Sequence, residues 1–539
     1  MQLAFASQMR ELDRQTIEEI GVPGMVLMEN AGRGTVDQMV KTFGQVSGKT
    51  VCIFAGPGNN GGDGLVIART VHGLGGFPFV FFLLDPEQLK GDAAHNYAIY
   101  QRLRLPCQTL APGERMVTWM DTILTLHRMH PMHSLVDAIF GTGLQREVDG
   151  HFLDIINTIN ILRSRHHLPV VAVDIPSGLN SDTGQVLGAS VQADLTVTYG
   201  LPKPGHYHHG GGCVGRLEPI DIGIPAKIVA NADLKGSVLT GSIAGQLRQR
   251  SVAAHKGANG HLLILAGSEG KTGAALLCGR GALHSGAGLV TFAVPQDLNL
   301  IFETAIAESM SVALPGSRKF LSVEDFDQIK ALAEGKNGLV LGPGIGTEEP
   351  TAQLVLRLYR EISTPLVVDA DALNILAAHP EVISRPAGPR IFTPHPGEMA
   401  RLLATTIETV QADRLQAAQW LNAPAAEGAG EELPPMITVL KGAGTVLAAA
   451  SGEWAINTTG NPGMASGGMG DVLAGIIGSL LVQGYAPWDA SCLGVYLHSL
   501  AADLIAGSRP YGFTASEVAQ MLPQVIGRCL SQPQKEKLC

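Results

Sequence analysis

Short runs of apolar residues alternate with helix-length segments in the first part of the chain. These runs lie at 51–55, 79–84, 134–140, 170–173 and 195–199. They lack the period-two alternation of a half-exposed strand, so the pattern predicts strands buried on both faces of a parallel sheet, with helices between them. We therefore expect a doubly wound, Rossmann-like three-layer α/β domain here.

A second series of apolar runs lies at 261–266, 288–293, 339–341, 365–368, 390–392 and 437–440. Residues 224–249, between the two series, are small and polar and favour a domain junction, so we predict domains at 1–235 and 236–539. Almost every run of the second series ends in Gly, Pro, Asp, Asn or His, and ligands bind beyond the carboxyl ends of strands in open α/β sheets. Residues 423–435, rich in Ala, Glu, Gly and Pro, are predicted to form a surface excursion.

The composition supports two large domains that bind a small ligand. The 539 residues exceed what one ordinary core accommodates, and 45% hydrophobic residues with 66 glycines fit buried parallel sheets joined by tight loops. The 38 Lys and Arg against 48 Asp and Glu give a net charge of −10, without a basic stripe. This charge disfavours nucleic acid as a partner.

Cysteine usage and the N-terminal segment indicate a cytoplasmic protein. The 7 cysteines show no CxxC spacing, which argues against a disulfide framework or a zinc site. Near the N-terminus, apolar residues from Met9 to Ile20 recur at helical spacing. This segment lacks the sequence of charged, apolar and small-residue regions that a signal peptide has. The long uncharged run at 472–488 is broken by Gln, Gly and Pro, so we expect no membrane span.

The first candidate site is the glycine-rich loop at 56–64. It satisfies G-x-G-x-x-G after a predicted strand, a dinucleotide fingerprint that is weak by itself. Pro57 and the polar residues Asn59, Asn60 and Asp63 are unusual in that fingerprint. They suggest a loop whose side chains coordinate a ligand in addition to the phosphate binding by its backbone.

Oxygen-bearing side chains follow other strands of the same predicted sheet. We expect Asn60, Asp137, Asp174 and Ser177 to meet at one rim, where their oxygens suit a hard cation. The structural alternative is that Asp137 and Asp174 only cap helices or turns.

The second candidate site lies at 461–475, where a run of glycines and Asp471 begin an apolar helix. Backbone N–H groups at such a turn bind anions, assisted by the helix dipole. A carboxylate there repels phosphate, so its presence indicates proton transfer, as in phosphoryl transfer to a hydroxyl. A Walker A motif ending at Thr272 is excluded, because Leu265 occupies its first glycine position.

The N-terminal half resembles the YjeF-type epimerase domain of the bifunctional NAD(P)H-hydrate repair enzymes. Four motifs carry the likeness, at 28–33, 59–63, 141–144 and 173–178. The resemblance implies a K⁺ ion held by Asn60, Asp137 and Ser177, with Asp174 as the acid/base that interconverts R and S hydrates. It further implies hydrate contacts from Asn59, Asn60, Gly61, Gly62, Asp63, Gly141, Thr142, Gly143, Leu144, Gln145, Arg146 and Glu147.

The C-terminal half resembles the family's ribokinase-like dehydratase domain, whose signature matches 461–475. The resemblance implies dehydration of S-NADHX or S-NADPHX driven by ADP with Mg²⁺, although eukaryotic relatives use ATP. Asp471 would then meet the reacting hydroxyl. The implied hydrate contacts are Ala274, Gly344 or Gly346, and His395, and the implied adenine nucleotide contacts are Lys441, Gly442, Ala443, Gly444, Thr445 and Gly470.

Simpler interpretations of these residues remain open. His395 can cap a turn between prolines, and Lys441 can be a solvated loop lysine. A small-molecule kinase with a regulatory dinucleotide domain leaves Asn60, Asp137 and Ser177 unused, and a non-catalytic ADP or NAD sensor does not explain Asp471. We also expect a homo-oligomer.

Overall fold

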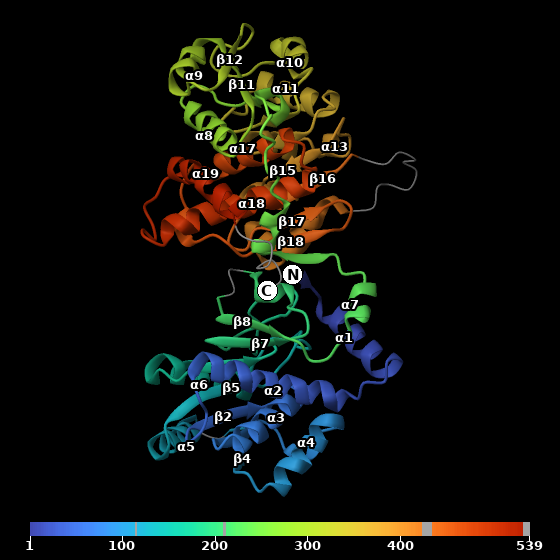
Figure 1. Ribbon diagram of the computed structural model, residues 1–539, viewed down its shortest axis with the longest axis vertical. Coiled ribbons are helices and arrows are strands. Elements are labelled where there is room, and N and C mark those ends of the chain that lie inside the picture. The colour runs from blue at the N-terminus through green and yellow to red at the C-terminus, as the bar shows by residue number, and fades with distance from the viewer. Residues whose placement is uncertain (111, 114–115, 209–211, 423–433, 532–539) are drawn as a thin grey trace. The chain divides into compact units, whose positions relative to one another are not determined.

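The structure is a computed structural model that describes residues 1–110, 112–113, 116–208, 212–422 and 434–531. The expected surface excursion at 423–435 falls almost entirely outside the described residues. Two compact units divide the chain, Gln2–Lys235 and Gly236–Cys539, the second together with Met1 (Figure 1). Each unit is an α/β structure and is described by itself.

The N-terminal unit is built on a parallel sheet of 7 strands in the order β4-β3-β2-β5-β6-β7-β8. The strands are β2 (Thr50–Ala55), β3 (Phe77–Phe82), β4 (Cys107–Thr109), β5 (Met132–Ala138), β6 (Val170–Val173), β7 (Leu195–Tyr199) and β8 (Arg216–Ile220). The strands predicted from the apolar runs are confirmed and form the centre of the sheet. The edge strands β4 and β8 are partly exposed and carried no continuous apolar run.

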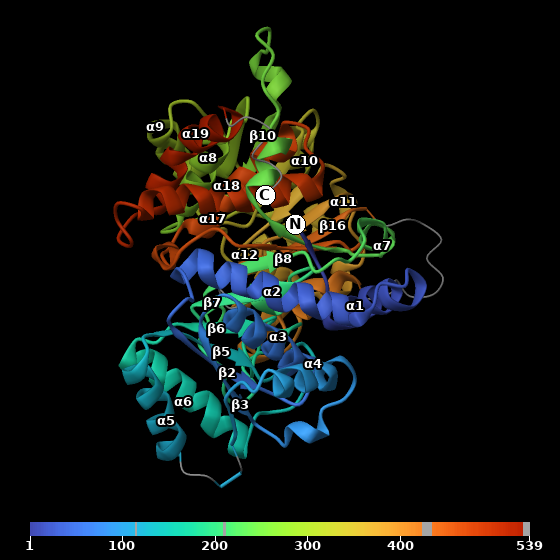
Figure 2. The same cartoon turned by 60° about the horizontal axis from the view of Figure 1, so that its bottom comes forward.

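Helices cover both faces of this sheet. Along β2, Val51 and Ile53 pack into one core with α2 (Gly24–Phe43) and α3 (Asn59–Gly73), whereas Cys52 and Phe54 pack into another with α5 (Met116–Met129) and α6 (Gly150–His166) (Figure 2). This arrangement confirms the predicted Rossmann-like three-layer fold. Further helical segments of this unit are α1 (Ala6–Arg14), a π-helical turn (Gln15–Glu19), α4 (Gly91–Arg102), α7 (Ala226–Asn231) and 3-10 turns at Pro86–Gln88 and Pro204–His206.

The C-terminal unit contains a mixed sheet in the order β9-β18-β17-β16-β15-β14-β13-β10-β11-β12. Its strands are parallel from β12 to β16, and β17 is antiparallel to both of its neighbours. The bounds are β9 (Gly236–Leu239), β10 (His261–Leu265), β11 (Leu289–Pro295), β12 (Met310–Leu314), β13 (Gly338–Leu341), β14 (Leu366–Val368), β15 (Arg390–Phe392), β16 (Met436–Leu440), β17 (Val446–Ala449) and β18 (Trp454–Asn457).

The predicted strands of the second series are confirmed as the parallel part of this sheet. Strands β12, β17 and β18 were not predicted. The segment 224–249, which the sequence favoured as a domain junction, contains α7 and β9, and the two compact units meet in the chain between Lys235 and Gly236. Strands β9, β12, β17 and β18 have only four or five residues and contain alanine, glycine, serine or asparagine, so their apolar signal is too weak to be recognised.

Helix α17 (Met469–Val482) is the central helix of the C-terminal unit. It packs on α8 (Thr272–His284) and α18 (Pro487–Ala506), and every residue from Val472 to Val482 is buried. A Cβ on Gly475 would lie 2.0 Å from the carbonyl oxygen of Cys278, so α8 and α17 meet through backbone. Because the helix is apolar all round, its position is fixed by packing, and so is the first turn that carries Asp471.

The other helices surround the sheet and its loops. They are α9 (Asn299–Ala305), α10 (Phe326–Ala333), α11 (Glu349–Glu361), α12 (Asp371–Ala377), α13 (Pro380–Ile383), α14 (Pro396–Leu402), α15 (Ile407–Ala412), α16 (Arg414–Ala418) and α19 (Ala515–Ser531). Within the described ranges, no helix has both the length and the apolar character needed to cross a membrane.

Candidate active sites

A cavity of about 560 Å³ opens at the carboxyl ends of the central strands of the N-terminal unit. It collects most of the predicted residues of this half: Asn59, Asn60, Asp63, Gly141, Thr142, Gly143, Leu144 and Asp174. The predicted contacts Gly61, Gly62, Gln145, Arg146 and Glu147 do not line it. Their proposed contact with a hydrate therefore has no support from the cavity.

The start of α3 forms one wall of this cavity. Gly58, Asn59 and Asn60 line it, and no side chain caps the helix, so its first N–H groups are free to bind an anion. A Cβ on Gly61 would lie 2.1 Å from the carbonyl oxygen of Gly56. The glycine fingerprint thus serves close packing of the turn as well as access for a ligand.

Asp174 is held rigidly in the cavity wall. Its backbone has a left-handed φ of 64°, and its Oδ1 accepts hydrogen bonds from Lys203 Nζ at 2.6 Å, Thr198 Oγ1 at 3.0 Å and the Tyr199 amide at 3.2 Å. His206 Nε2 lies 3.0 Å from the carbonyl oxygen of Asp174. Burial alone would raise the pKa of the Asp174 carboxyl, but the charge and hydrogen bond of Lys203 outweigh it, and the pKa lies below its ordinary value. Asp174 is therefore ionised at neutral pH.

Asp63 has the opposite character. Its side chain is buried, and within the described residues it forms no hydrogen bond or ion pair. Burial, followed by the negative charges of Asp174 and Asp13, raises the pKa of Asp63 well above its ordinary value. One cavity therefore holds an ionised carboxyl and a carboxyl that favours its neutral form.

Asp13, Tyr199 and Lys203 also line this cavity, and sequence reasoning missed them as site residues. Asp13 lies on α1, its Oδ1 is buried without a partner, and burial raises the pKa of Asp13 to about 6. Tyr199 Oη lies 3.0 Å from Thr35 Oγ1. Lys203 lies between Pro202 and Pro204, and no local sequence pattern there indicates that it pairs with Asp174.

The residues expected to hold K⁺ are partly brought together. Ser177 donates from its Oγ to Asp137 Oδ1 at 2.6 Å and from its amide to Asp137 Oδ2 at 2.8 Å. The Ile139 amide also donates to Asp137 at 3.3 Å, so the turn-capping alternative describes part of its role. Asn60 is buried beside the 141 turn, 3.6 Å from the position of a Cβ on Gly141.

This oxygen set fits a hard cation on two observations. Asp137 is fully buried with no cationic side chain bonded to it among the described residues, and burial raises the pKa of Asp137 to about 6. The amide Nδ2 of Asn60 is buried without a partner, and the nitrogen and oxygen of an amide are assigned from hydrogen bonding. A bound cation would satisfy both groups.

The second site is formed by residues directly after adjacent parallel strands of the C-terminal unit. Asp369 follows β14, Thr393 follows β15 and Lys441 follows β16. Asp369 Oδ1 accepts from Lys441 Nζ at 2.8 Å and from Thr393 Oγ1 at 2.7 Å, and Lys441 Nζ lies 3.9 Å from Glu398 Oε2. Lys441 is thus largely buried and paired, and the alternative of a solvated lysine is wrong.

Asp471 lies in the first turn of α17, beside this network. The helix follows the Gly467-Gly468 turn, Gly468 has a φ of 88°, and no side chain caps the N-terminus. A Cβ on Gly467 would meet no atom within 4 Å, whereas one on Gly470 would lie 3.0 Å from Lys441 Nζ. The turn therefore presents free N–H groups to open space next to a buried cation.

The charge environment of Asp471 suits a general base. Burial, then the negative charge of Asp369, raises the pKa of Asp471 to about 7, although Lys441 acts in the opposite direction. A carboxylate with this pKa accepts a proton far more readily than an ordinary aspartate does.

The remaining predicted residues of this half lie around the same strand ends. A Cβ on Gly344 would lie 3.2 Å from Ala274 Cβ, and the Gly346 amide donates to Asp371 Oδ2 at 2.9 Å. His395 caps α14, because its Nδ1 accepts from the Gly397 amide at 3.0 Å, as the structural alternative proposed. Its side chain is half exposed, and its Nε2 lies 3.4 Å from Glu398 Oε1.

The loop at 441–445, expected to contact a nucleotide, is held by an arginine that sequence reasoning missed. Arg414 is buried, and its guanidinium donates to the carbonyl oxygens of Leu440 at 3.2 Å, Lys441 at 3.3 Å and Gly444 at 3.5 Å. Gly442, Ala443 and Thr445 lie in the loop that these bonds shape. Arg414 fixes the backbone without itself occupying the site.

Across the part of the chain that the structure describes, no group of three or more His, Cys, Asp or Glu side chains is arranged to hold a metal ion. The predicted K⁺ site depends instead on amide and hydroxyl oxygens with a single carboxylate, and Mg²⁺ is commonly held in proteins by one or two carboxylates together with phosphate oxygens.

Fold and sites together define a protein of two α/β units, with two carboxyls of opposite character in the cavity of one unit and, in the other, an uncapped helix N-terminus that carries a carboxyl of raised pKa. Residues 262–524 match the NAD(P)H-hydrate dehydratase family, and residues 24–205 match the YjeF-related protein N-terminus. The bifunctional NAD(P)H-hydrate repair enzyme of Moorella thermoacetica is 42% identical over 98% of this chain and 97% of its own length. That of Escherichia coli is 32% identical over 97% and 93%. The chain belongs to the family of bifunctional NAD(P)H-hydrate repair enzymes.

Two solved structures are similar to the C-terminal part. The ADP/ATP-dependent NAD(P)H-hydrate dehydratase from Bacillus subtilis, co-crystallised with ATP and Mg²⁺, is 29% identical and covers 54% of this chain and 98% of its own, with a TM-score of 0.46. A ribokinase-like superfamily protein from Enterococcus faecalis is 26% identical and covers 56% and 98%, with a TM-score of 0.47.

Proposed function

We propose that this chain repairs hydrated NADH and NADPH. Its N-terminal unit interconverts the R and S hydrates, and its C-terminal unit dehydrates the S hydrate at the expense of a nucleotide phosphoanhydride bond, with ADP as donor. Family membership over nearly the whole chain supports both activities. The single observation that carries the proposal is Asp471, a carboxyl with a raised pKa in the first turn of an uncapped, glycine-led helix.

In the C-terminal unit, Asp471 accepts the proton of the ring hydroxyl as that oxygen attacks the transferred phosphoryl group. The free N–H groups at 467–470 and the Lys441 cation stabilise the charge that develops on the phosphoryl oxygens. The phosphate then leaves as the lone pair of the ring nitrogen forms a C=N bond. Loss of a proton from the neighbouring ring carbon forms the ring C=C bond, returns the electron pair to nitrogen and restores the dihydronicotinamide.

Mg²⁺, when bound with the nucleotide, neutralises phosphate charge. Asp369, Glu398 and Asp371 all raise the pKa of Asp471 by their negative charges, and of these Glu398 and Asp371 would hold the ion, because Asp369 is bonded to Lys441 and Thr393. In the N-terminal unit, Asn60, Asp137 and Ser177 would hold K⁺, which would neutralise the buried Asp137 and order the loop after β5. We also infer that the protein is cytoplasmic and that it assembles as a homo-oligomer. Its location and its oligomeric state both stay predictions.

The proposal is tested by incubating the purified chain with a mixture of both hydrates, with and without ADP and Mg²⁺. We expect complete recovery of reduced nicotinamide absorbance only with nucleotide, and recovery limited by spontaneous epimerisation when Asp174 is replaced by Ala. Failure of the wild-type chain to convert either hydrate would overturn the proposal. A wild-type dehydration rate in Asp471→Ala would overturn the assignment of the base.

A further inference from the structure

The cavity of the N-terminal unit holds two carboxyls with opposite environments, those of Asp174 and Asp63. Only Asp174 is assigned a catalytic role by the proposed function. We propose that Asp63 is a second catalytic residue, which donates a proton to the ring hydroxyl of one hydrate while Asp174 accepts the proton of the incoming water. The two residues exchange these roles when the reaction runs in the other direction. This inference rests on the proposed epimerase function.

The burial of Asp63 makes it a proton donor. Its side chain lies on the first turns of α3, lines the cavity and is only 8% exposed. Within the described part of the chain, no hydrogen bond or ion pair satisfies its carboxyl oxygens. An unpaired buried carboxylate is strongly disfavoured, whereas the neutral acid needs no counterion and presents one O–H donor. A ligand in the cavity is the partner that this side chain lacks.

Asp174 is fixed in the complementary state. The ammonium of Lys203 lies 2.6 Å from its Oδ1, and this lysine is itself only 1% exposed. The ion pair keeps Asp174 ionised beside a neutral Asp63. Environments that drive two neighbouring carboxyls toward different protonation states are a known arrangement for an acid and base pair.

The chemical step balances with these two groups alone. Asp63 gives its proton to the ring hydroxyl, the C–O bond breaks as water leaves, and the lone pair of the adjacent ring nitrogen forms a C=N bond. Water then adds to the opposite face of the same carbon, the C=N electron pair returns to nitrogen, and Asp174 takes the proton of the added water. Asp63 ends ionised and Asp174 protonated, which is the starting state for the reverse direction.

Several charged or titratable groups face this cavity and bear on its pH dependence: Arg10 and Asp13 from α1, Asp92 from α4, Asp174 after β6, Tyr199 from β7 and Lys203 after it. Asp13 is a positioning residue in this scheme. Its negative charge favours the protonated form of Asp63, as does that of Asp174.

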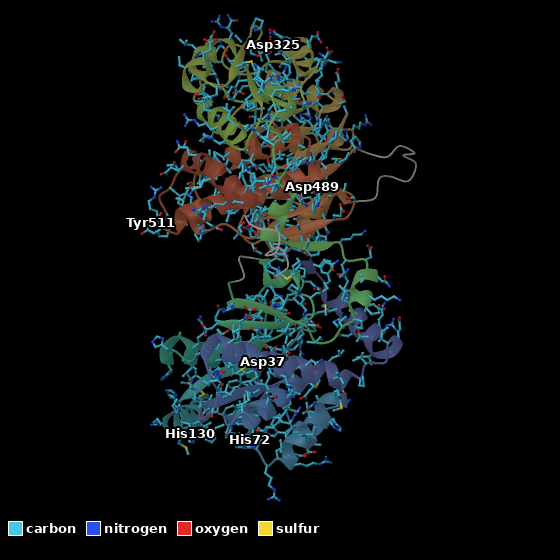
Figure 3. All side chains as sticks on the ribbon, viewed as in Figure 1. Asp37, His72, His130, Asp325, Asp489 and Tyr511 are labelled. Atoms are coloured by element: carbon cyan, nitrogen blue, oxygen red, sulfur yellow. The ribbon has the colours of Figure 1, made fainter. Side chains whose placement is uncertain are left out.

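The test compares Asp63→Asn, Asp13→Asn and the control Asp37→Asn in the full-length chain. Asp37 is exposed on α2 and lies outside the cavity lining (Figure 3). The assay is the R-to-S rate, corrected for spontaneous interconversion, as a function of pH. A second measurement is the infrared difference spectrum of the protonated carboxyl band.

We expect Asp63→Asn to lower kcat by at least ~100-fold with little change in KM, because general acid catalysis typically contributes ~10²–10⁴-fold. It should also lose the protonated carboxyl band and retain dehydratase activity. Asp13→Asn should stay active, but the alkaline limb of its pH profile should move to lower pH, because Asp63 then loses its proton more easily. Asp37→Asn should behave as the wild type.

A wild-type rate in Asp63→Asn, or an unmoved alkaline limb in Asp13→Asn, would overturn the assignment of Asp63. Should Asp63→Asn fold poorly, the shift of the alkaline limb in the pH profile of Asp13→Asn still tests whether Asp63 is the proton donor. If the unmodified chain does not epimerise at all, the proposed function fails, which is a different result from failure of the acid assignment.

Discussion

The Lys203–Asp174 ion pair gives a prediction whose size follows from its burial. The side chains are 2% and 13% exposed, and Nζ lies 2.6 Å from Oδ1. Replacing Lys203 by Met removes the cation and leaves Asp174 as an uncompensated buried charge. Breaking one partner of a buried pair costs about 3–5 kcal/mol. For a domain of this size each kcal/mol lowers Tm by about 2–4 °C, so the transition of the N-terminal unit should fall by about 6–20 °C.

The assay is calorimetric unfolding of the full chain at neutral pH, with Asp174→Asn and the double variant completing a cycle. The double variant should recover part of the loss, because removing both charges leaves no unpaired ion. Lys235→Met is the matched control. Its pair with Asp233 is 2.9 Å long, but the two side chains are 49% and 82% exposed, so its loss should cost less than about 1 kcal/mol.

The pH dependence of this effect has a definite sign. The folded pKa of Asp174 is depressed, so the stability that the pair contributes is present above the unfolded pKa of about 3.9 and is lost as pH falls through the folded value. The deficit of Lys203→Met should therefore shrink in acid. A deficit no larger than that of the control, or strict additivity in the cycle, would refute the reasoning.

Three further predictions concern the proposed sites. Dehydration should rise with pH through about 7 as Asp471 ionises, and Asp471→Asn should lose at least ~100-fold in kcat while still binding nucleotide in a fluorescence titration. Arg414→Met should raise the KM for nucleotide by freeing the 441–445 loop and leave epimerisation unchanged; equal effects on both activities would point to general destabilisation. Exchanging K⁺ for tetramethylammonium should lower the Tm of the N-terminal unit, and Asp137→Asn should abolish this difference; a potassium shift that survives the substitution would place the ion elsewhere.

Apolar runs predicted the fold because the central strands are buried on both faces. Val51, Ile53 and their neighbours have no exposed side, so a continuous apolar run suffices to mark such a strand. Strand β17 gives no comparable signal, because its run of Val, Leu and Ala is short and continues into small residues. Strand β9 also lacks a continuous apolar run, because Gly236 and Ser237 form half of it.

The site was predictable where chemistry sits in a motif and not where it depends on pairing across the fold. Asp63, Asp174 and Asp471 stand in glycine-rich or strand-end motifs, which mark them as loop residues with chemical roles. Asp13 lies on an ordinary amphipathic helix. Arg414 contacts the 441–445 loop in space but precedes Lys441 by 27 residues in the sequence. Their contacts arise only when α1 and α16 pack, and no periodicity within a single segment contains that information.

The contact between α8 and α17 makes activity sensitive to positions that no ligand reaches. At Gly475 the two backbones leave no room for a methyl group, so even alanine would force the helices apart and carry the carboxyl of residue 471 with them. A displacement of about 1 Å at a reacting group can lower a rate by about 100-fold. Random mutagenesis of this protein should thus yield variants without dehydratase activity whose substitutions lie inside the helix pair, about one turn of helix or more from Asp471.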